Sequence, residues 1–343
     1  MKILHIAKPH KFSIPFFRFV ERHLDASQHV ILTRRRKNSW PADMRITSHA
    51  VSGLRWMLAF ARMAKDAEKI MLHGLLDFRV VLVLALQPQL LKKCHWFIWG
   101  GDLYRYNASS KGPGWHLKEA FRRPVIRQMG HLVTYIDGDV ALARQWYGAT
   151  GQYHECLLYP SNLYHAPTVP PAIGSSVINL QIGNSANPSN NHAEVFDILR
   201  PFRNTAIRIH APLSYGNTRH ALKVAEEGQA RFGDKFVAMT AFLPFDEYLE
   251  FLAKIDIAVF NHDRQQAMGN TITLLGLGKK VYIRENASPW HLFQRLGITV
   301  YSVSEFNLDP MPASTREANV QRVSEFFSEQ TLKHQLRQIF EES

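Results

Sequence analysis

Short apolar runs alternate with longer amphipathic stretches along the whole chain. Strand-like runs occupy residues 2–7, 30–33, 69–74, 94–101, 131–136, 156–159, 177–182, 206–210, 236–242, 255–260, 280–283 and 299–303. Segments of helical length separate many of these runs. The alternation predicts parallel sheets with helices on both faces. The stretch 314–340 has apolar residues at helical spacing and predicts a closing helix.

A Pro-rich stretch, HAPTVPPAIGSS at 165–176, divides the chain into two parts of ordinary domain size. We therefore predict an α/β protein with two Rossmann-like domains. The first spans residues 1–165, the linker 166–176, and the second residues 177–343 with the closing helix. Ligands of such open sheets bind outside the carboxyl ends of the strands, so candidate chemistry belongs in the loops that follow each strand.

The basic charge of the protein lies entirely in its first half. Residues 1–165 hold 24 Lys and Arg against 11 Asp and Glu, a net charge of +13, whereas the remaining residues carry −1. Such a surface indicates an anionic partner, which is nucleic acid, an acidic membrane surface or a phosphorylated substrate, unless it only maintains solubility. The segments 53–65 and 116–130 mix basic and large apolar residues, as bilayer-surface helices do; if the apolar residues face the core, the arginines are only a solvated face.

The sequence shows little evidence of export or of membrane insertion. The chain has only two cysteines, Cys94 and Cys156, and its opening residues lack the long apolar core of a signal peptide. The most apolar window, 75–91, is interrupted by charged residues and a proline. We expect a protein of the reducing cytoplasm, without a transmembrane segment.

Two loops of the second half suit phosphate or sugar binding. Gly183, Asn184 and Ser185 follow a predicted strand, and the polar segment 264–270 precedes an apolar helix at 271–277. Free amides at a helix start attract a pyrophosphate. The alternative for each loop is an ordinary turn with a helix cap. The first loop does not match the dinucleotide fingerprint G-x-G-x-x-G, and the chain has neither a zinc motif nor a nucleophile elbow.

The first half offers isolated candidates. His10 and His73 follow or end predicted strands, and each either contacts substrate or serves structure. Asp137-Gly138-Asp139 is a D-x-D arrangement able to hold a divalent cation, although Asp139 also suits a helix N-cap, which is the favoured interpretation. Asp102 follows the aromatic run HWFIWGG at a strand's carboxyl end.

Several motifs in the same order resemble glycosyltransferase family 56, the TDP-N-acetylfucosamine:lipid II N-acetylfucosaminyltransferases of enterobacterial common antigen assembly. They are FIWGGDLY at 97–104, IGNSANPSNNH at 182–192, FDEYLEFL at 245–252, RQQAMGNT at 264–271, and REN followed by PW at 284–290. The resemblance implies a GT-B architecture, two Rossmann-like domains facing across a cleft. It implies a TDP-linked amino-deoxy sugar donor on the second domain and an undecaprenyl-pyrophosphate oligosaccharide acceptor on the first, at the cytoplasmic face of the inner membrane.

The resemblance also suggests roles for residues. Asp102 would act as the base that takes a proton from the acceptor hydroxyl. The competing account is that Asp102 caps a turn or holds the two domains in register. The sequence does not fix whether transfer inverts or retains the anomeric configuration, and retention would weaken the need for a base. Residues assigned to the acceptor are His10, His73, Trp99, Gly100, Gly101 and Tyr104. Residues assigned to the donor are Gly183, Asn184, Ser185, Tyr215, Arg264, Gln265, Gln266, Gly269, Asn270, Thr271, Glu285 and Asn286.

No metal or cofactor is required in this scheme, because helix amides can stabilise the departing diphosphate. Three alternatives stay open. One is a metal-dependent transferase built on Asp137 and Asp139, which EDTA would inhibit. Another is a protein that binds nucleic acid through its basic half, although the chain lacks a recognisable reading motif. The third is a nucleotide-sugar-binding regulator without turnover, which only an activity assay excludes.

Overall fold

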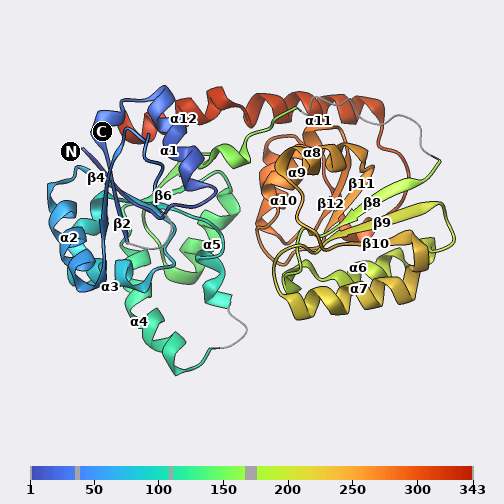
Figure 1. Cartoon of the computed structure of the whole chain (residues 1–343), viewed down its shortest axis with the longest axis horizontal. Coiled ribbons are helices and arrows are strands. Elements are labelled where there is room, and N and C mark those ends of the chain that lie inside the picture. The colour runs from blue at the N-terminus through green and yellow to red at the C-terminus, as the bar shows by residue number, and fades with distance from the viewer. Residues whose placement is uncertain (1, 35–38, 108–110, 167–175, 342–343) are drawn as a thin grey trace. The chain divides into compact units, whose positions relative to one another are not determined.

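The computed structural model describes residues 2–34, 39–107, 111–166 and 176–341. The chain divides into two compact units (Figure 1). Unit 1 comprises Met1–Asn162 and returns for Glu329–Ser343, and unit 2 comprises Leu163–Ser328. The predicted linker 166–176 falls mostly outside the described residues.

Unit 1 is built on a parallel sheet with strand order β3-β2-β1-β4-β5-β6-β7. Its strands are β1 (Ile3–Ile6), β2 (His29–Arg34), β3 (Thr47–Val51), β4 (Lys69–His73), β5 (Cys94–Phe97), β6 (His131–Thr134) and β7 (Gln152–Glu155). Its helices are α1 (Ser13–His23), α2 (Gly53–Asp66), α3 (Phe78–Leu86), α4 (Pro113–Arg127), α5 (Asp137–Tyr147) and α12 (Glu329–Glu341). Helices α2 to α5 share one hydrophobic core with the sheet. Aromatic residues of α1 and α12 pack on His5 of β1, whose side chain points to the opposite face.

Unit 2 repeats this plan with strand order β10-β9-β8-β11-β12-β13. Its strands are β8 (Ile178–Ile182), β9 (Ile207–Pro212), β10 (Phe236–Met239), β11 (Ile257–Phe260), β12 (Lys280–Ile283) and β13 (Tyr301–Ser302). Its helices are α6 (His192–Leu199), α7 (Thr218–Phe232), α8 (Phe245–Lys254), α9 (Met268–Gly276), α10 (Ser288–Arg295) and α11 (Ala313–Phe326). Every strand pair is parallel, as the alternation predicts.

Most of the predicted strands are present, and three differences have local causes. The run 156–159 is not a strand, because Leu158 adopts a positive φ of 69° and the apolar side chains are buried in a loop. The seventh strand, β7, is instead the polar segment before it. Strand β3 was not predicted, because four of its five residues are exposed and carry no apolar signal. The predicted closing helix is two helices, α11 and α12, and α12 belongs to unit 1 rather than to the second domain.

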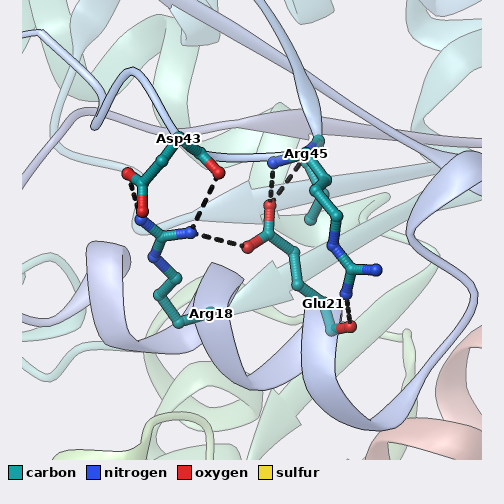
Figure 2. Close-up of polar contacts among 5 residues, drawn as sticks. Arg18, Glu21, Asp43 and Arg45 are labelled. Carbon is teal, nitrogen blue, oxygen red and sulfur yellow. Dashed lines mark hydrogen bonds and ion pairs between the residues drawn. The ribbon is translucent and has the colours of Figure 1, made fainter.

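A buried carboxylate fixes the segment before β3 to α1 (Figure 2). Glu21, 7% exposed, accepts hydrogen bonds from the backbone amides of Arg45 and Ile46 and from the Arg18 guanidinium. Arg18 also pairs with Asp43. Beside this segment lies a cavity of about 510 Å³, which Arg34 of β2 and Arg45 help to line.

Two expectations about the chain as a whole can be compared with the described residues. Cys94 and Cys156 are both buried and unpaired, so there is no disulfide between them. Within the described ranges, none of the helices combines the length and the apolar character needed to cross a bilayer.

Candidate functional site

Each sheet has one topological switch point. There, successive strands stop being added on one side of the first strand and begin to be added on its other side. In unit 1 it lies between β1 and β4, and in unit 2 between β8 and β11. Loops leaving the sheet there diverge and leave room for a ligand at the carboxyl ends. Seven candidate residues lie in these loops: His10 after β1, Gly183, Asn184 and Ser185 after β8, and Arg264, Gln265 and Gln266 after β11.

In unit 2, Asn190 organises the loop that follows β8. It is fully buried, and its side-chain oxygen accepts hydrogen bonds from the Asn184 amide at 2.8 Å and from His262 Nε2 at 2.9 Å. Its side-chain nitrogen donates to Ser185 Oγ at 3.2 Å. The loop after β8 is thus joined to the loop after β11, which contains His262.

Gln266 makes a second connection between the same loops. Its side-chain nitrogen donates to Asn184 Oδ1 at 2.9 Å, and Ser189 Oγ donates to its side-chain oxygen at 2.7 Å. Asn184 in turn donates to the Tyr215 hydroxyl at 2.7 Å, from the loop after β9. Residues predicted from three separate loops therefore form one neutral hydrogen-bonded network.

The backbone of this network is unusual at two positions. Gly183 has a φ of +59°, and a Cβ there would lie 2.6 Å from Asn190 Oδ1 and 2.9 Å from His192 Nε2. Ala267, immediately before α9, has a φ of 58°, which is strained for a residue with a side chain. The backbone thus approaches the network closely at Gly183, and a strained residue directly precedes the first amides of α9.

The remaining donor candidates are arranged around this network. Asn270 donates to the Tyr248 hydroxyl at 2.9 Å, and Thr271 Oγ1 donates to the Ala267 carbonyl at 3.1 Å, so both are used within the protein. Four residues, Arg264, Gln265, Gly269 and Tyr215, are partly or largely exposed, and Glu285 and Asn286 are exposed after β12.

Two residues near the network, His192 and Arg284, were not among the sequence candidates. His192 is 1% exposed, and neither of its ring nitrogens has a hydrogen-bond partner. Burial, followed by the nearby His220, lowers the pKa of His192 to about 4, so its imidazole is neutral. Arg284, at the end of β12, donates to Asn261 Oδ1 at 2.6 Å and pairs with Glu194. The sequence did offer a signal for both, because His192 ends the motif at 182–192 and Arg284 begins the REN motif.

In unit 1, the Asp102 carboxylate is fully buried and accepts four hydrogen bonds. Leu75 N and Trp96 Nε1 donate to Oδ2 at 2.8 and 2.7 Å, and Trp99 N and Leu103 N donate to Oδ1 at 3.0 Å each. Both oxygens are occupied by fixed donors of the protein. This geometry favours the turn-holding alternative for Asp102 over the role of base.

A residue of α4 also fixes the backbone around Asp102. Arg122, 5% exposed, donates to the carbonyl oxygens of Leu75 and Asp102. Gly100 has a φ of +76°, as expected for a turn that only glycine enters freely, whereas Gly101 has an ordinary φ and is exposed. The first glycine shapes the loop, and the second leaves its surface open.

Trp99 lies at the end of a chain of buried hydrogen bonds. Its Nε1 donates to the Tyr159 hydroxyl at 2.8 Å, which is 2.7 Å from His73 Nδ1. His73 Nε2 is 3.0 Å from His5 Nδ1, and His5 Nε2 is 2.8 Å from His29 Nδ1. Burial lowers the pKa of His73 to about 3 and that of His29 to about 4. Both nitrogens of His73 have protein partners, which favours its structural role.

His10 is exposed and lies at the carboxyl-end edge of the unit 1 sheet, near Trp99. Its ring centroid lies 5.9 Å from that of Trp99, and Phe12 approaches the same indole at 6.2 Å. Tyr104 points away to α5, where its hydroxyl donates to Asp139 Oδ1 at 3.1 Å. His10, Phe12 and Trp99 therefore form an aromatic surface at the unit 1 switch point.

The D-x-D arrangement begins α5 and lacks a third metal ligand among the residues that the structure describes. Asp137 is the first helical residue, and Asp139, 1% exposed, lies in the first turn. The expected N-cap role of Asp139 is therefore wrong, since Ile136 occupies the cap and Asp139 is the third residue of the helix.

Solved structures of low sequence identity share this fold over the full chain. The apo structure of OtsA matches with a TM-score of 0.68 at 7% identity and covers 100% of both chains. Anabaena Alr3699/HepE, in complex with UDP and glucose, matches with a TM-score of 0.66 at 10% identity, again over 100% of both. WaaG, a glycosyltransferase involved in lipopolysaccharide biosynthesis, matches with a TM-score of 0.61 at 13% identity and covers 99% of this chain and 100% of its own.

These matches, with the two Rossmann-like sheets, confirm the GT-B fold. The family model described as 4-alpha-L-fucosyltransferase, glycosyl transferase group 56, matches residues 23–334, which is most of the chain. The chain therefore belongs to glycosyltransferase family 56 and is a glycosyltransferase.

Proposed function

We propose that this enzyme transfers an amino-deoxy sugar of the 4-acetamido-4,6-dideoxygalactose type from a TDP-sugar to an undecaprenyl-pyrophosphate-linked oligosaccharide in bacterial surface polysaccharide synthesis. The observation that carries the proposal is the neutral network of Asn184, Asn190 and Gln266 at the unit 2 switch point. Family membership supplies the fucosyl-type sugar, and the sequence resemblance supplies the TDP-sugar and the lipid-linked acceptor.

The donor diphosphate would lie at the start of α9. The φ of Ala267 turns the chain into that helix, whose first amides have no partner within the helix. Amides and the helix dipole stabilise negative charge, so the diphosphate can depart without a metal ion. Gly183 and Ser185 would approach the phosphates, Tyr215 the base, and Glu285 or Asn286 the ribose.

The acceptor would contact the aromatic surface of unit 1. Sugar rings stack on indoles, and the Tyr159 hydroxyl fixes the orientation of Trp99. Lys8 and Arg34 lie near the same edge and share Asp77, at 3.8 and 3.0 Å. These cations suit the pyrophosphate of a lipid-linked acceptor. In the reaction the acceptor oxygen bonds to the anomeric carbon, the bond from that carbon to the phosphate oxygen breaks, and the hydroxyl proton leaves.

Helices α2 and α4 supply a surface for an anionic bilayer. Leu54 and Leu58 of α2 are 78% and 71% exposed, and Leu117 of α4 is 62% exposed. Arg62 and Lys118 are exposed on the same helices. Apolar side chains with basic neighbours bind acidic membrane interfaces. This supports a peripheral location at the cytoplasmic face of the inner membrane, where a polyprenyl acceptor is available.

Thermal shifts with TDP, UDP and GDP, each with magnesium or with EDTA, test the donor assignment. A ligand at a hundredfold excess over its Kd stabilises the folded state by about 2.7 kcal/mol. We expect TDP to stabilise the enzyme best, with or without magnesium, and the Gly183→Ala variant to lose this shift. Gly148→Ala is the matched control, because Gly148 also has a positive φ of +67° but a Cβ there meets only Arg127, at 3.9 Å.

Two outcomes would argue against the proposal. Stabilisation only in the presence of magnesium would return attention to Asp137 and Asp139. An unchanged TDP shift in Gly183→Ala would remove the unit 2 network as the donor site. Transfer of radiolabelled sugar to a synthetic polyprenyl-pyrophosphate acceptor then tests the acceptor, and NMR of the product gives the stereochemistry.

A further inference from the structure

Three histidines on neighbouring strands of unit 1 form a compact cluster. They are His95 of β5, His131 of β6 and His154 of β7, and one nitrogen of each lies within 4.8 Å of the others. His95 pairs with His131 in the sheet register, and His154 is two residues beyond the partner of His131. Side chains two residues apart share a face, so all three project from the same side of the sheet.

The three imidazoles are close enough to bind one ion. His131 Nδ1 lies 2.9 Å from His154 Nε2, and the rings of His95 and His131 are stacked with centroids 3.9 Å apart. Without an ion, two of these nitrogens share a single proton. The cluster includes no carboxylate or thiolate, and imidazole nitrogens prefer borderline transition metals to magnesium or calcium.

The surroundings prepare the nitrogens for ligation. The Lys93 carbonyl lies 3.3 Å from His95 Nδ1, and because a carbonyl only accepts, that nitrogen carries the proton and leaves Nε2 with its lone pair. Backbone carbonyls fix metal-binding histidines in this way.

We propose that His95, His131 and His154 form a binding site for a divalent transition-metal ion of the zinc type, with a fourth coordination position open to water. His131 begins β6 and His95 is the second residue of β5, so the site lies toward the amino-terminal ends of the strands. The candidate substrate residues lie at the carboxyl ends. The ion would thus join the last three strands of the sheet and take no part in sugar transfer.

One neighbouring charge opposes metal binding. The Lys69 ammonium repels positive charge at all three histidines. It also donates to the carbonyl oxygens of Ile339 and Phe340 at 2.8 and 3.2 Å, in the last turn of α12, where the helix dipole offsets part of its charge. Replacing Lys69 by Met should therefore tighten metal binding, an effect that a nonspecific surface site would not show.

Cobalt titration of EDTA-treated, dialysed enzyme tests the site. We expect one Co²⁺ per chain with a visible absorption spectrum of low-coordinate cobalt, displaced by one equivalent of Zn²⁺. His154→Gln and His131→Gln should each weaken binding at least tenfold, and Lys69→Met should strengthen it. His116→Gln is the matched control, because His116 is exposed on α4 away from the cluster.

The measurements are independent of transferase activity. Zinc should also raise the unfolding temperature of the wild type and not that of His154→Gln, and the variant's own cooperative unfolding transition shows that it is folded. Absence of stoichiometric cobalt binding would overturn the proposal. Binding that His154→Gln and His131→Gln leave unchanged, or that His116→Gln reduces equally, would overturn it as well.

Discussion

Replacing Asp102 by Asn separates the two roles considered for this residue. The substitution puts an NH₂ group against two of the four N–H donors that the carboxylate accepts. Hydrogen bonds to a charged group contribute about 1.5–3 kcal/mol each, so the loss of two predicts a destabilisation of about 3–6 kcal/mol. That is a large share of the total stability of an ordinary domain, which is about 5–15 kcal/mol.

Urea denaturation followed by tryptophan fluorescence is the appropriate assay, because all tryptophans except Trp290 lie in unit 1. Asp66→Asn serves as the control, since Asp66 is exposed and its variant should stay within about 0.5 kcal/mol of the wild type. A variant Asp102→Asn of wild-type stability that binds TDP and lacks transfer activity would falsify the structural role and restore Asp102 as the base.

Three further predictions concern the acceptor, the pH response and the membrane. Trp99→Ala should raise KM for the acceptor several-fold and leave TDP binding unchanged; equal loss of both would contradict an acceptor role. Lowering the pH from about 7.5 to 5.5 should destabilise unit 1, because the unfolded chain protonates histidine near pH 6.5 whereas burial keeps the pKa of His73 at about 3. Each such histidine costs up to about 1.4 kcal/mol per pH unit below 6.5, and urea curves with a flat pH dependence would exclude this. Leu58→Ser should weaken binding to phosphatidylglycerol vesicles about tenfold. The control is Leu222→Ser in unit 2, at a leucine that is 62% exposed, and it should leave vesicle binding unchanged. If both variants weaken binding equally in a vesicle sedimentation assay, α2 is not the docking surface.

The alternation of apolar runs predicts the two sheets because buried parallel strands are apolar along their length. In unit 1 the same rule fails at the edges of the sheet. Strand β3 reads TSHAV and strand β7 reads QYHE, and both are polar because an edge strand is covered on fewer sides. The apolar run 156–159 was mistaken for a strand because burial alone does not distinguish a buried loop. The chain positions of α11 and α12 were predictable, but the return of α12 to unit 1 was not.

The positions of site residues were predictable where the residues follow a strand. Their roles were not predictable where hydrogen-bond partners from other parts of the fold decide them. Gly183, Asn184 and Gln266 were identified from loop position and residue type, and they do lie together. Asp102 was found by the same rule, yet its four donors come from the surrounding fold and give it a structural function. The clustering of His95, His131 and His154 depends on strand register, which no local pattern contains.

The strained positions of unit 2 explain why its switch point is the better candidate for diphosphate. Ala267 and Asn191 have positive φ angles, and each immediately precedes a helix, α9 and α6 respectively. For alanine this conformation costs about 1–2 kcal/mol, a cost that helix formation alone does not require, whereas asparagine enters it more readily. Asn191 directly follows Asn190 and Ala267 directly follows Gln266, so both positions adjoin the network. A strained residue directly before a helix is expected if the first amides of α9 must point at a ligand, and none of the described helices of unit 1 directly follows a non-glycine residue with a positive φ.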